Sequence, residues 1–565
     1  MAFLTAAISS GQVTFLISFL WSLIAWLYAE FLHSLRGSPQ LEGSDTVDEE
    51  SHDPKLQKPL QPHEDDGAAA AANGAAAGGA EDPNDGAKPD GDVLSSSGGS
   101  GGLGGMLDSM ARSGLVSCLL LRPRALVQQR LVLRQVVEFG ALMAWYFVAD
   151  RTTLVPHGDK SYSRDVFVFL FAALTAVAVG TSLRAFKIPL LLNRPQTEEW
   201  KGWMQVLFLL YHYFEAREVY NAIRIFIAAY VWMTGFGNFS YYYKTGDFCI
   251  GRFVQMLWRL NFLVFFACVV LRNSYMLYYI CPMHTIFTVF VYGALAIAPQ
   301  LNNHHGWLLV KILLCAAFIF VTWDIKPVFY VLWSPLKFLL GYSDPRNPTD
   351  DVLHEWYFRS GLDRYIWVYG MLCALMHPKA SSLLKRIDDL PALRRHTVRA
   401  LVLAACGVAG YVYYITIYVR PKYEYNQVHP YTSWIPITLW IIVRNMTPGL
   451  RTFSLRLYGW LGCITLETYI SQFHIWMKTD VPDGQPRSLL VLLPGYPLLN
   501  FAAVTALYVL VSHRLFDLTN SLKSVAVPHS NNGLLLRNLI MMAAGGTLLW
   551  CAVSALYSTT SRLWS

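Results

Sequence analysis

The sequence predicts an all-α fold, a polytopic bundle of transmembrane helices with a disordered loop after the first span. Hydrophobic residues make up 54% of the 565 residues and charged residues only 15%, against about a quarter in ordinary soluble domains. Apolar runs of about 20 residues, the length that crosses a bilayer, recur along the chain. Residues 34–105 hold fourteen acidic and four basic residues, which leaves a net charge of +17 on the rest of the chain. Many of the remaining basic residues flank apolar runs, as in membrane proteins.

Ten apolar runs have the length of a span. They are residues 13–31, 167–183, 222–243, 253–271, 275–299, 307–323, 400–418, 457–476, 498–512 and 535–556. Shorter or interrupted runs lie at residues 136–148, 203–214, 328–340, 362–376 and 432–443. We therefore expect about ten to thirteen spans, a density that excludes a soluble enzyme with a single anchor.

The N-terminal third divides into three segments before the membrane domain. Residues 1–33 lack a basic segment ahead of the apolar run, so we interpret them as a retained anchor and not a cleaved signal. Residues 34–110 are acidic and then rich in Gly and Ala, a composition that buries too little apolar surface to fold. Residues 111–135 form a basic juxtamembrane segment, and residues 136–565 a multi-pass membrane domain.

Composition and motifs exclude several classes of function. The basic residues do not cluster on a soluble face, so we expect no nucleic-acid partner. The nine cysteines are scattered without metal-ligand spacing, so we expect neither a disulfide framework nor a bound metal. No nucleophile elbow supports a serine hydrolase, and no Gly-rich phosphate loop precedes a helix.

Polar side chains inside the apolar runs are the main functional signal. Each costs roughly 2.5–3.5 kcal/mol on insertion scales, so it usually pairs with a partner or lines a cavity. The group comprises Arg224, Arg259, Asp363, Arg364, Arg444, Asn445, Glu467 and His474. For any one of them, a buried pair that holds helices together is an equally good explanation. The number of such residues, together with the histidines His212, His284 and His474 in the apolar runs, favours proton or acyl transfer.

The stretch QTEEWKGWMQVLFLLYHYF contains the most informative pair. Ten residues separate Lys201 from His212, which places them on one helix face about 16 Å apart along the axis. Glu199 is close enough to pair with Lys201 or to orient a base. Basic residues flank Lys201, which favours a cytosolic position for this helix end. Taken alone, an interfacial anchor and a hydrogen-bonded core histidine explain the pair better than a functional site does.

Several long stretches resemble the plant reduced wall acetylation proteins, multi-pass Golgi proteins needed for O-acetylation of cell-wall polysaccharides. These stretches are QTEEWKGWMQVLFLLYHYF, IRIFIAAYVWMTGFGNFSYYY, VLHEWYFRSGLDRYIW, HPYTSWIPI and ITLETYISQFHIW. The first span and the DRT at residues 150–152 fit as well. The wider family includes the animal sialate O-acetyltransferase and fungal capsule acetylation proteins. A distantly related acyltransferase family carries the same spacing of a basic residue and a functional histidine.

The resemblance implies an O-acetyltransferase, or its donor-side component, in the Golgi membrane with cytosolic acetyl-CoA as donor. His212 is then expected to take the acetyl group or act as general base, with Glu467 and His474 as a second acid–base pair. The expected donor-binding residues are Lys201, Arg224, Arg259, Arg359 and Arg364. We expect Glu199, Asp363, Arg444 and Asn445 to support the site.

The acceptor and the final step stay open at the level of sequence. Xylan, xyloglucan and pectin fit equally well. The animal relatives carry a hydrolase-like domain with a G-D-S motif where this chain has its acidic loop, so a separate luminal G-D-S-type transferase is an expected partner. The alternative is a transporter that moves acetyl-CoA or another acetyl donor into the lumen, although the internal repeats common in transporters are not apparent.

Overall fold

The computed structural model describes residues 8–36, 123–528 and 532–564, and within them the chain is almost entirely helical. This confirms the predicted all-α class. Residues 37–110 of the predicted disordered loop and residues 111–122 of the basic segment lie outside the described residues, whereas residues 34–36, predicted as part of the loop, are helical. The described residues divide into two compact units, one of residues 16–36 and 123–140, the other of residues 8–15, 141–528 and 532–564.

The smaller unit contains most of α1 (Ser10–Arg36), α4 (Pro123–Gln128) and the first part of α5 (Arg130–Arg151). Its core comprises Ala25, Ala29 and Leu126, all at most 1% exposed. Small side chains let these helices approach closely, as in many membrane helix pairs.

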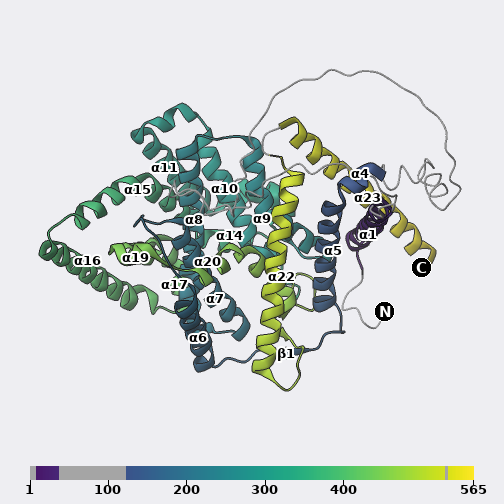
Figure 1. Ribbon diagram of the computed structural model, residues 1–565, viewed down its shortest axis with the longest axis horizontal. Coiled ribbons are helices and arrows are strands. Elements are labelled where there is room, and N and C mark those ends of the chain that lie inside the picture. The colour runs from purple at the N-terminus through teal and green to yellow at the C-terminus, as the bar shows by residue number, and fades with distance from the viewer. Residues whose placement is uncertain (1–7, 37–122, 529–531, 565) are drawn as a thin grey trace, which may run out of the picture. The chain divides into compact units, whose positions relative to one another are not determined.

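The larger unit contains the remaining elements (Figure 1). Its longer helices are α6 (Arg164–Ser182), α7 (Arg194–Phe214), α8 (Tyr220–Thr245), α9 (Ile250–Leu271), α10 (Ile280–Ala296), α11 (His305–Ile319), α15 (Ile366–Asp388), α16 (Ala392–Tyr413), α18 (Trp434–Asn445), α22 (Pro497–Ala526) and α23 (Asn532–Trp564). The shorter ones are α12 (Lys326–Trp333), α13 (Lys337–Leu340), α14 (His354–Leu362), α17 (Lys422–Thr432), α19 (Pro448–Thr452), α20 (Arg456–Cys463) and α21 (Thr465–Ser471).

Short strands pair at the ends of the helices. A three-stranded antiparallel sheet has the order β1 (His157–Asp159), β5 (Ser488–Leu490) and β4 (Met477–Lys478). A two-stranded sheet pairs β2 (Leu183–Ala185) with β3 (Phe453–Leu455). These pairs connect loops that are far apart in the sequence.

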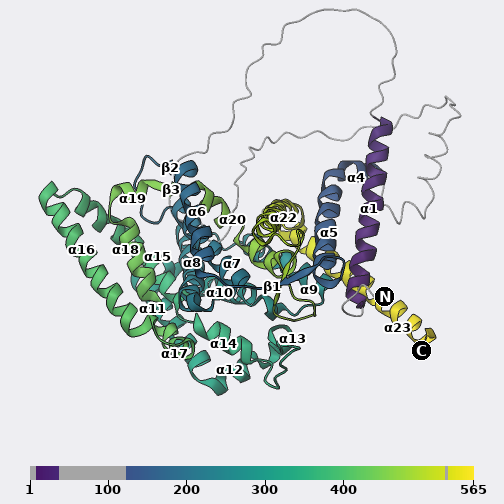
Figure 2. The same cartoon turned by 90° about the horizontal axis from the view of Figure 1, so that it is seen from below.

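The core of the larger unit forms where α7 packs on α8 and α20 (Figures 1 and 2). Glycine permits this packing, since a Cβ at Gly202 in α7 would lie 1.8 Å from the Tyr458 carbonyl oxygen in α20. Similarly, a Cβ at Gly235 in α8 would lie 1.9 Å from the Trp367 carbonyl oxygen in α15. Such close backbone approach is how helices pack tightly in membranes.

Nine helices in the described ranges are long and apolar enough to cross a membrane, and α10 is a shorter apolar helix. Residues 136–148, predicted as an interrupted run, lie in α5, which is one of the nine. The predicted span at residues 328–340 is divided among α12, a 3₁₀ turn and α13.

The prediction of one continuous span over residues 457–476 is wrong. Here the chain breaks into α20, α21 and a π-helical turn, η7 (Gln472–Trp476). The break is tolerated because its backbone is buried in protein and finds partners there. Gln205 in α7 donates from Nε2 to the Thr465 carbonyl (3.3 Å), and the Thr468 hydroxyl donates to the Ile464 carbonyl (3.1 Å).

Candidate active site

The helix that carries His212, α7, has well-defined ends. The Asn193 side chain caps its start by accepting a hydrogen bond from the Gln196 N–H (2.9 Å). Pro195 occupies the first turn, where its missing N–H costs no hydrogen bond. The helix ends at Phe214, and Glu215 caps this end with a left-handed backbone (φ 56°). His212 therefore lies in the last turn of α7, three turns beyond Lys201.

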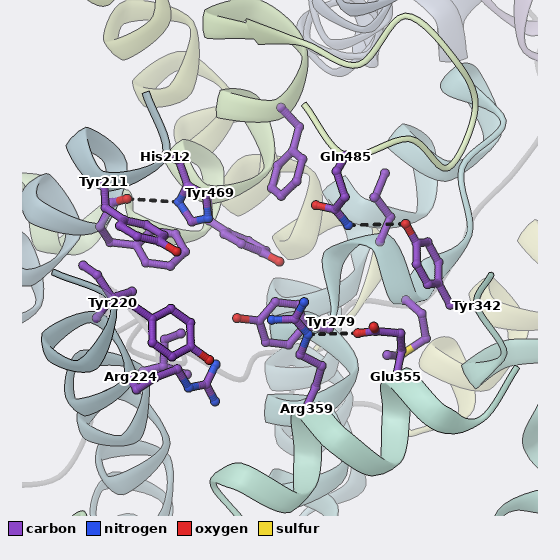
Figure 3. Close-up of a pocket in the computed structure, with 16 residues that line it drawn as sticks. Tyr211, His212, Tyr220, Arg224, Tyr279, Tyr342, Glu355, Arg359, Tyr469 and Gln485 are labelled. Carbon is purple, nitrogen blue, oxygen red and sulfur yellow. Dashed lines mark hydrogen bonds and ion pairs between the residues drawn. The ribbon is translucent and has the colours of Figure 1, made fainter. Parts of the chain in front are cut away.

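The hydrogen bond of the His212 ring defines its neutral tautomer. Nδ1 lies 3.0 Å from the Phe208 carbonyl oxygen. A carbonyl can only accept, so in the neutral ring Nδ1 carries the proton and Nε2 keeps its lone pair. The ring is held edge-on between Phe208 and Tyr211, with centroid distances of 4.4 and 5.0 Å. Figure 3 shows the second ring nitrogen on the side of the cavity.

His212 lines a cavity of about 90 Å³ built by elements far apart in the sequence. Its walls come from the end of α7, the start of α8, the 3₁₀ turn η2 (Tyr275–Tyr278), α14, α21, η7 and two loops. Among the predicted site residues, His212, Arg224 and Arg359 lie together in this lining.

Both arginines of the cavity are held by acidic partners. The Arg359 Nε donates to Glu355 (3.0 Å) one helical turn away, and its guanidinium lies 4.7 Å from the centre of the Tyr279 ring. Arg224 donates from Nη2 to Asp363 (2.9 Å), one of the residues predicted to support the site. Each guanidinium is thereby fixed in orientation and compensated in charge.

Phenol groups and one loop complete the lining. Five tyrosines border the cavity: Tyr211, Tyr220, Tyr279, Tyr342 and Tyr469. The loop residue Tyr342 donates to the Asp483 carbonyl (2.8 Å) and accepts from Gln485 (3.3 Å). Burial raises the pKa of Tyr342 to about 12, so this phenol stays protonated at neutral pH.

A lysine outside the spans connects two segments that border the cavity. Lys160, in the loop between α5 and α6, donates from Nζ to the carbonyl oxygens of His212 and Pro486, each at 2.9 Å. Burial lowers the pKa of Lys160 to about 8. This one amine connects the end of α7 with the loop that carries Gln485.

The remaining predicted site residues lie outside the cavity lining. Lys201 pairs with Glu198 (2.6 Å) and Glu199 with Arg444 (3.3 Å), while Arg364 pairs with Asp324 (2.8 Å). The Asn445 amide donates to the Ile441 carbonyl (2.9 Å) in its own helix.

Glu467 and His474 have separate partners. Arg259 donates to both carboxylate oxygens of Glu467. The His474 Nδ1 lies 2.7 Å from Asp150, and its Nε2 lies 2.6 Å from the Tyr278 hydroxyl. Both residues are fully buried and neither lines the cavity, so this geometry does not support an acid–base pair made of the two.

Sequence reasoning did not identify Glu355, Tyr279 and Gln485. The i,i+4 spacing of Glu355 and Arg359 was a usable signal, because acid and base at this spacing pair on one helix face. Tyr279 and Gln485 had no comparable signal, since their positions depend on the packing of distant segments.

The chain matches a family model described as the ten-transmembrane acyl transferase domain found in Cas1p, over residues 119–540. It belongs to this family. The match includes every residue that lines the cavity, and it confirms the prediction of a multi-pass membrane acyltransferase. Family membership alone does not assign a donor, an acceptor or a catalytic residue.

A curated relative from Danio rerio, N-acetylneuraminate (7)9-O-acetyltransferase, is 32% identical over 423 residues. The aligned region is 71% of this chain and 52% of the relative, so the chain spans about half the length of the protein it matches. No solved structure matches the chain.

Proposed function

We propose that this acyltransferase is a Golgi O-acetyltransferase of the plant reduced wall acetylation type, which uses acetyl-CoA to acetylate a wall polysaccharide such as xylan, xyloglucan or pectin. The observation that carries the proposal is the His212 Nε2 lone pair at a cavity that also holds two fixed guanidinium groups. The relative named for O-acetyl transfer to a sugar supports the same class of acceptor.

Two routes for acetyl transfer use the same lone pair. As general base, His212 takes the proton of an acceptor hydroxyl while the hydroxyl oxygen attacks the acetyl carbonyl carbon. The new C–O bond forms, the thioester C–S bond breaks, and the proton passes from His212 to the departing thiolate. As nucleophile, Nε2 attacks the acetyl carbon, the C–S bond breaks and the thiolate leaves, which gives an acyl-imidazole. The acceptor hydroxyl then attacks this acetyl group, the C–N bond breaks, and the hydroxyl proton passes to the freed Nε2 and on to the thiolate. In both routes Arg359 and Arg224 are positioned to stabilise the oxyanion.

The size and position of the cavity limit how the donor binds. A volume of about 90 Å³ admits the acetyl end of a thioester but not the whole of CoA. Lys201 lies about 16 Å away along α7, so CoA phosphates bound at that end require the pantetheine arm to run along the helix. This assignment of Lys201 is part of the proposal.

A luminal partner of the G-D-S type is proposed to complete transfer to polysaccharide. The sequence contains no G-D-S motif that could supply the serine of such a transferase. Purified protein, acetyl-CoA and a xylan oligosaccharide, with and without such a transferase, test the division of labour. Efficient acetylation by the chain alone would show that it is the complete enzyme.

The assignment of His212 is tested with two substitutions and a control. His212→Asn keeps a donor near the Nδ1 position for the Phe208 carbonyl but removes Nε2, and His212→Ala removes both. We expect each to lower turnover of labelled acetyl-CoA by about 10²–10⁴-fold, the range for a lost general base. His513→Ala changes a histidine whose side chain is 41% exposed, so activity should be unaffected. Undiminished activity in a folded His212→Asn variant would exclude the proposed role.

A further inference from the structure

A buried network of polar side chains lies outside the lining of the cavity. Its centre is the Asp150 carboxylate, which is fully buried and accepts hydrogen bonds from several donors. They include the His474 Nδ1–H (2.7 Å), the Thr479 N–H (2.6 Å) and the Thr479 hydroxyl (2.8 Å). Arg151 pairs with the same carboxylate at 2.5 Å. This charge is therefore well compensated, as burial requires.

The network continues from Asp150 through His474 to Tyr278. A neutral His474 ring donates from Nδ1 to the carboxylate, so its Nε2 accepts from the Tyr278 hydroxyl (2.6 Å). The Tyr278 oxygen in turn accepts from the Asn273 amide (2.9 Å). Asp150, His474 and Tyr278 are all 0% exposed, so solvent and substrate do not reach them.

One end of the network, at Tyr278, adjoins the part of the cavity lining that contacts Arg359. Tyr278 closes the turn η2, whose Met276 and Leu277 line the cavity, and Tyr279 follows directly. The Arg359 guanidinium lies against the Tyr279 ring at 4.7 Å. A hydrogen bond that fixes Tyr278 therefore also fixes the surface on which Arg359 rests.

The other end reaches the loop that carries Gln485. Asp150 holds the start of this loop at Thr479, and the Asn273 side chain accepts from the Asp483 N–H (3.0 Å). Asp480 and Asp483 have φ values of 63° and 60°, which are unfavourable for residues other than glycine. Such strain persists only where surrounding contacts overdetermine the backbone. Figure 3 shows Gln485 with Tyr342 and Arg359 with Glu355 at the cavity.

We propose that Asp150, His474 and Tyr278 are positioning residues for acetyl transfer, which hold Arg359 and the Gln485 loop at fixed positions relative to His212. They touch neither donor nor acceptor, because they are buried behind the residues that line the cavity. The inference rests on the proposed role of the His212 cavity. In this proposal His474 is not an acid or base; it acts indirectly, by fixing Tyr279 and the loop that carries Gln485.

The variant that tests the network is Tyr278→Phe, which removes a single buried oxygen. We expect kcat with acetyl-CoA, a xylan oligosaccharide and the G-D-S-type transferase to fall about tenfold or more, because displacement of a catalytic group by a fraction of an ångström is costly. The KM for acetyl-CoA should change less than twofold. The pH–rate profile should keep both of its limbs, since no proton-transfer group is lost.

Tyr458→Phe is the matched control. Tyr458 is 1% exposed and its hydroxyl hydrogen-bonds to Thr175 (2.6 Å), so the variant removes a hydrogen bond of another buried phenol, which does not line the cavity. It should reproduce any loss of stability in Tyr278→Phe but keep the wild-type kcat. A kcat for Tyr278→Phe equal to that of Tyr458→Phe would overturn the inference. Loss of one limb of the pH–rate profile in Tyr278→Phe would also overturn it, because that result indicates direct proton transfer.

Two single substitutions of His474 separate its two hydrogen bonds, the one to Asp150 and the one to Tyr278. His474→Gln places an amide oxygen near the Nε2 position, where it accepts from Tyr278, whereas His474→Asn places an amide donor near Nδ1, where it contacts Asp150. Hydrogen exchange of backbone amides reports the loss of each hydrogen bond without any activity assay. Faster exchange is expected around Tyr279 in His474→Asn and in residues 479–485 in His474→Gln.

Equal exchange rates of the two variants, both around Tyr279 and in residues 479–485, would contradict the positioning role. This readout also distinguishes the inference from the proposed function. A wild-type protein that transfers no acetyl group would refute the function, while segment-specific exchange would still support the network.

Discussion

Replacing Lys160 with methionine should remove a specific part of the dependence of stability on pH. The Lys160 amine has a pKa of about 8 in the folded protein, against 10.5 for an unperturbed lysine, and burial is the main cause. Between these two values the unfolded chain binds more protons than the folded chain. Stability therefore rises with pH over this interval and is lost as pH falls through 8.

The size of the effect follows from the shift of about 2.5 pKa units. At 1.36 kcal/mol per unit, Lys160 contributes a rise of about 3 kcal/mol in the free energy of unfolding between pH 8 and 10.5. Other lysines, tyrosines and cysteines titrate over the same range, so the difference between wild type and variant is the informative quantity. Tm should increase more between pH 8 and 10.5 in the wild type than in Lys160→Met.

The assay is thermal unfolding of the full chain in detergent at pH 7, 8, 9 and 10. Lys160→Arg is the control, because guanidinium keeps its charge throughout the range and should abolish the same rise. Equal pH dependence of Tm in all three proteins would refute the reasoning. That result would show that burial of the Lys160 amine does not lower its pKa.

Three further perturbations give distinct outcomes. Gly235→Ala places a Cβ 1.9 Å from the Trp367 carbonyl oxygen, so we expect α8 and α15 to separate, the free energy of unfolding to fall by at least the roughly 1–3 kcal/mol typical of overpacking, and Tm in detergent to fall with it. An unchanged Tm would contradict the close packing. Arg259→Met leaves the Glu467 carboxylate buried without its partner and should destabilise the chain by about 3–5 kcal/mol, whereas the double substitution with Glu467→Leu should recover much of that loss, as a double-mutant cycle would measure. Lys201→Glu places a second carboxylate beside Glu198 and should weaken the binding of CoA, which carries negatively charged phosphates. Unchanged affinity for CoA would exclude Lys201 from the donor site.

The sequence alone was sufficient for the fold class and for the helix that carries His212. Apolar runs and helical spacing are local properties, so the chain could be identified as a polytopic helical bundle, with Lys201 and His212 three turns apart on one helix. His212 lies in a cavity with Arg224 and Arg359, as the density of buried polar residues suggested. The Glu355–Arg359 pair is also local and was detectable in principle.

The tertiary structure decided which polar groups meet. His474 and Glu467 are two turns apart in sequence, but their partners are Asp150, 324 residues away, and Arg259, 208 residues away. The break between α20 and α21 likewise depends on partners such as Gln205, which no local pattern specifies. A buried charge is stable only beside a compensating group, and helix packing determines which group is within reach. For that reason the residue types that carry chemistry were visible in the sequence, whereas their roles depended on the fold.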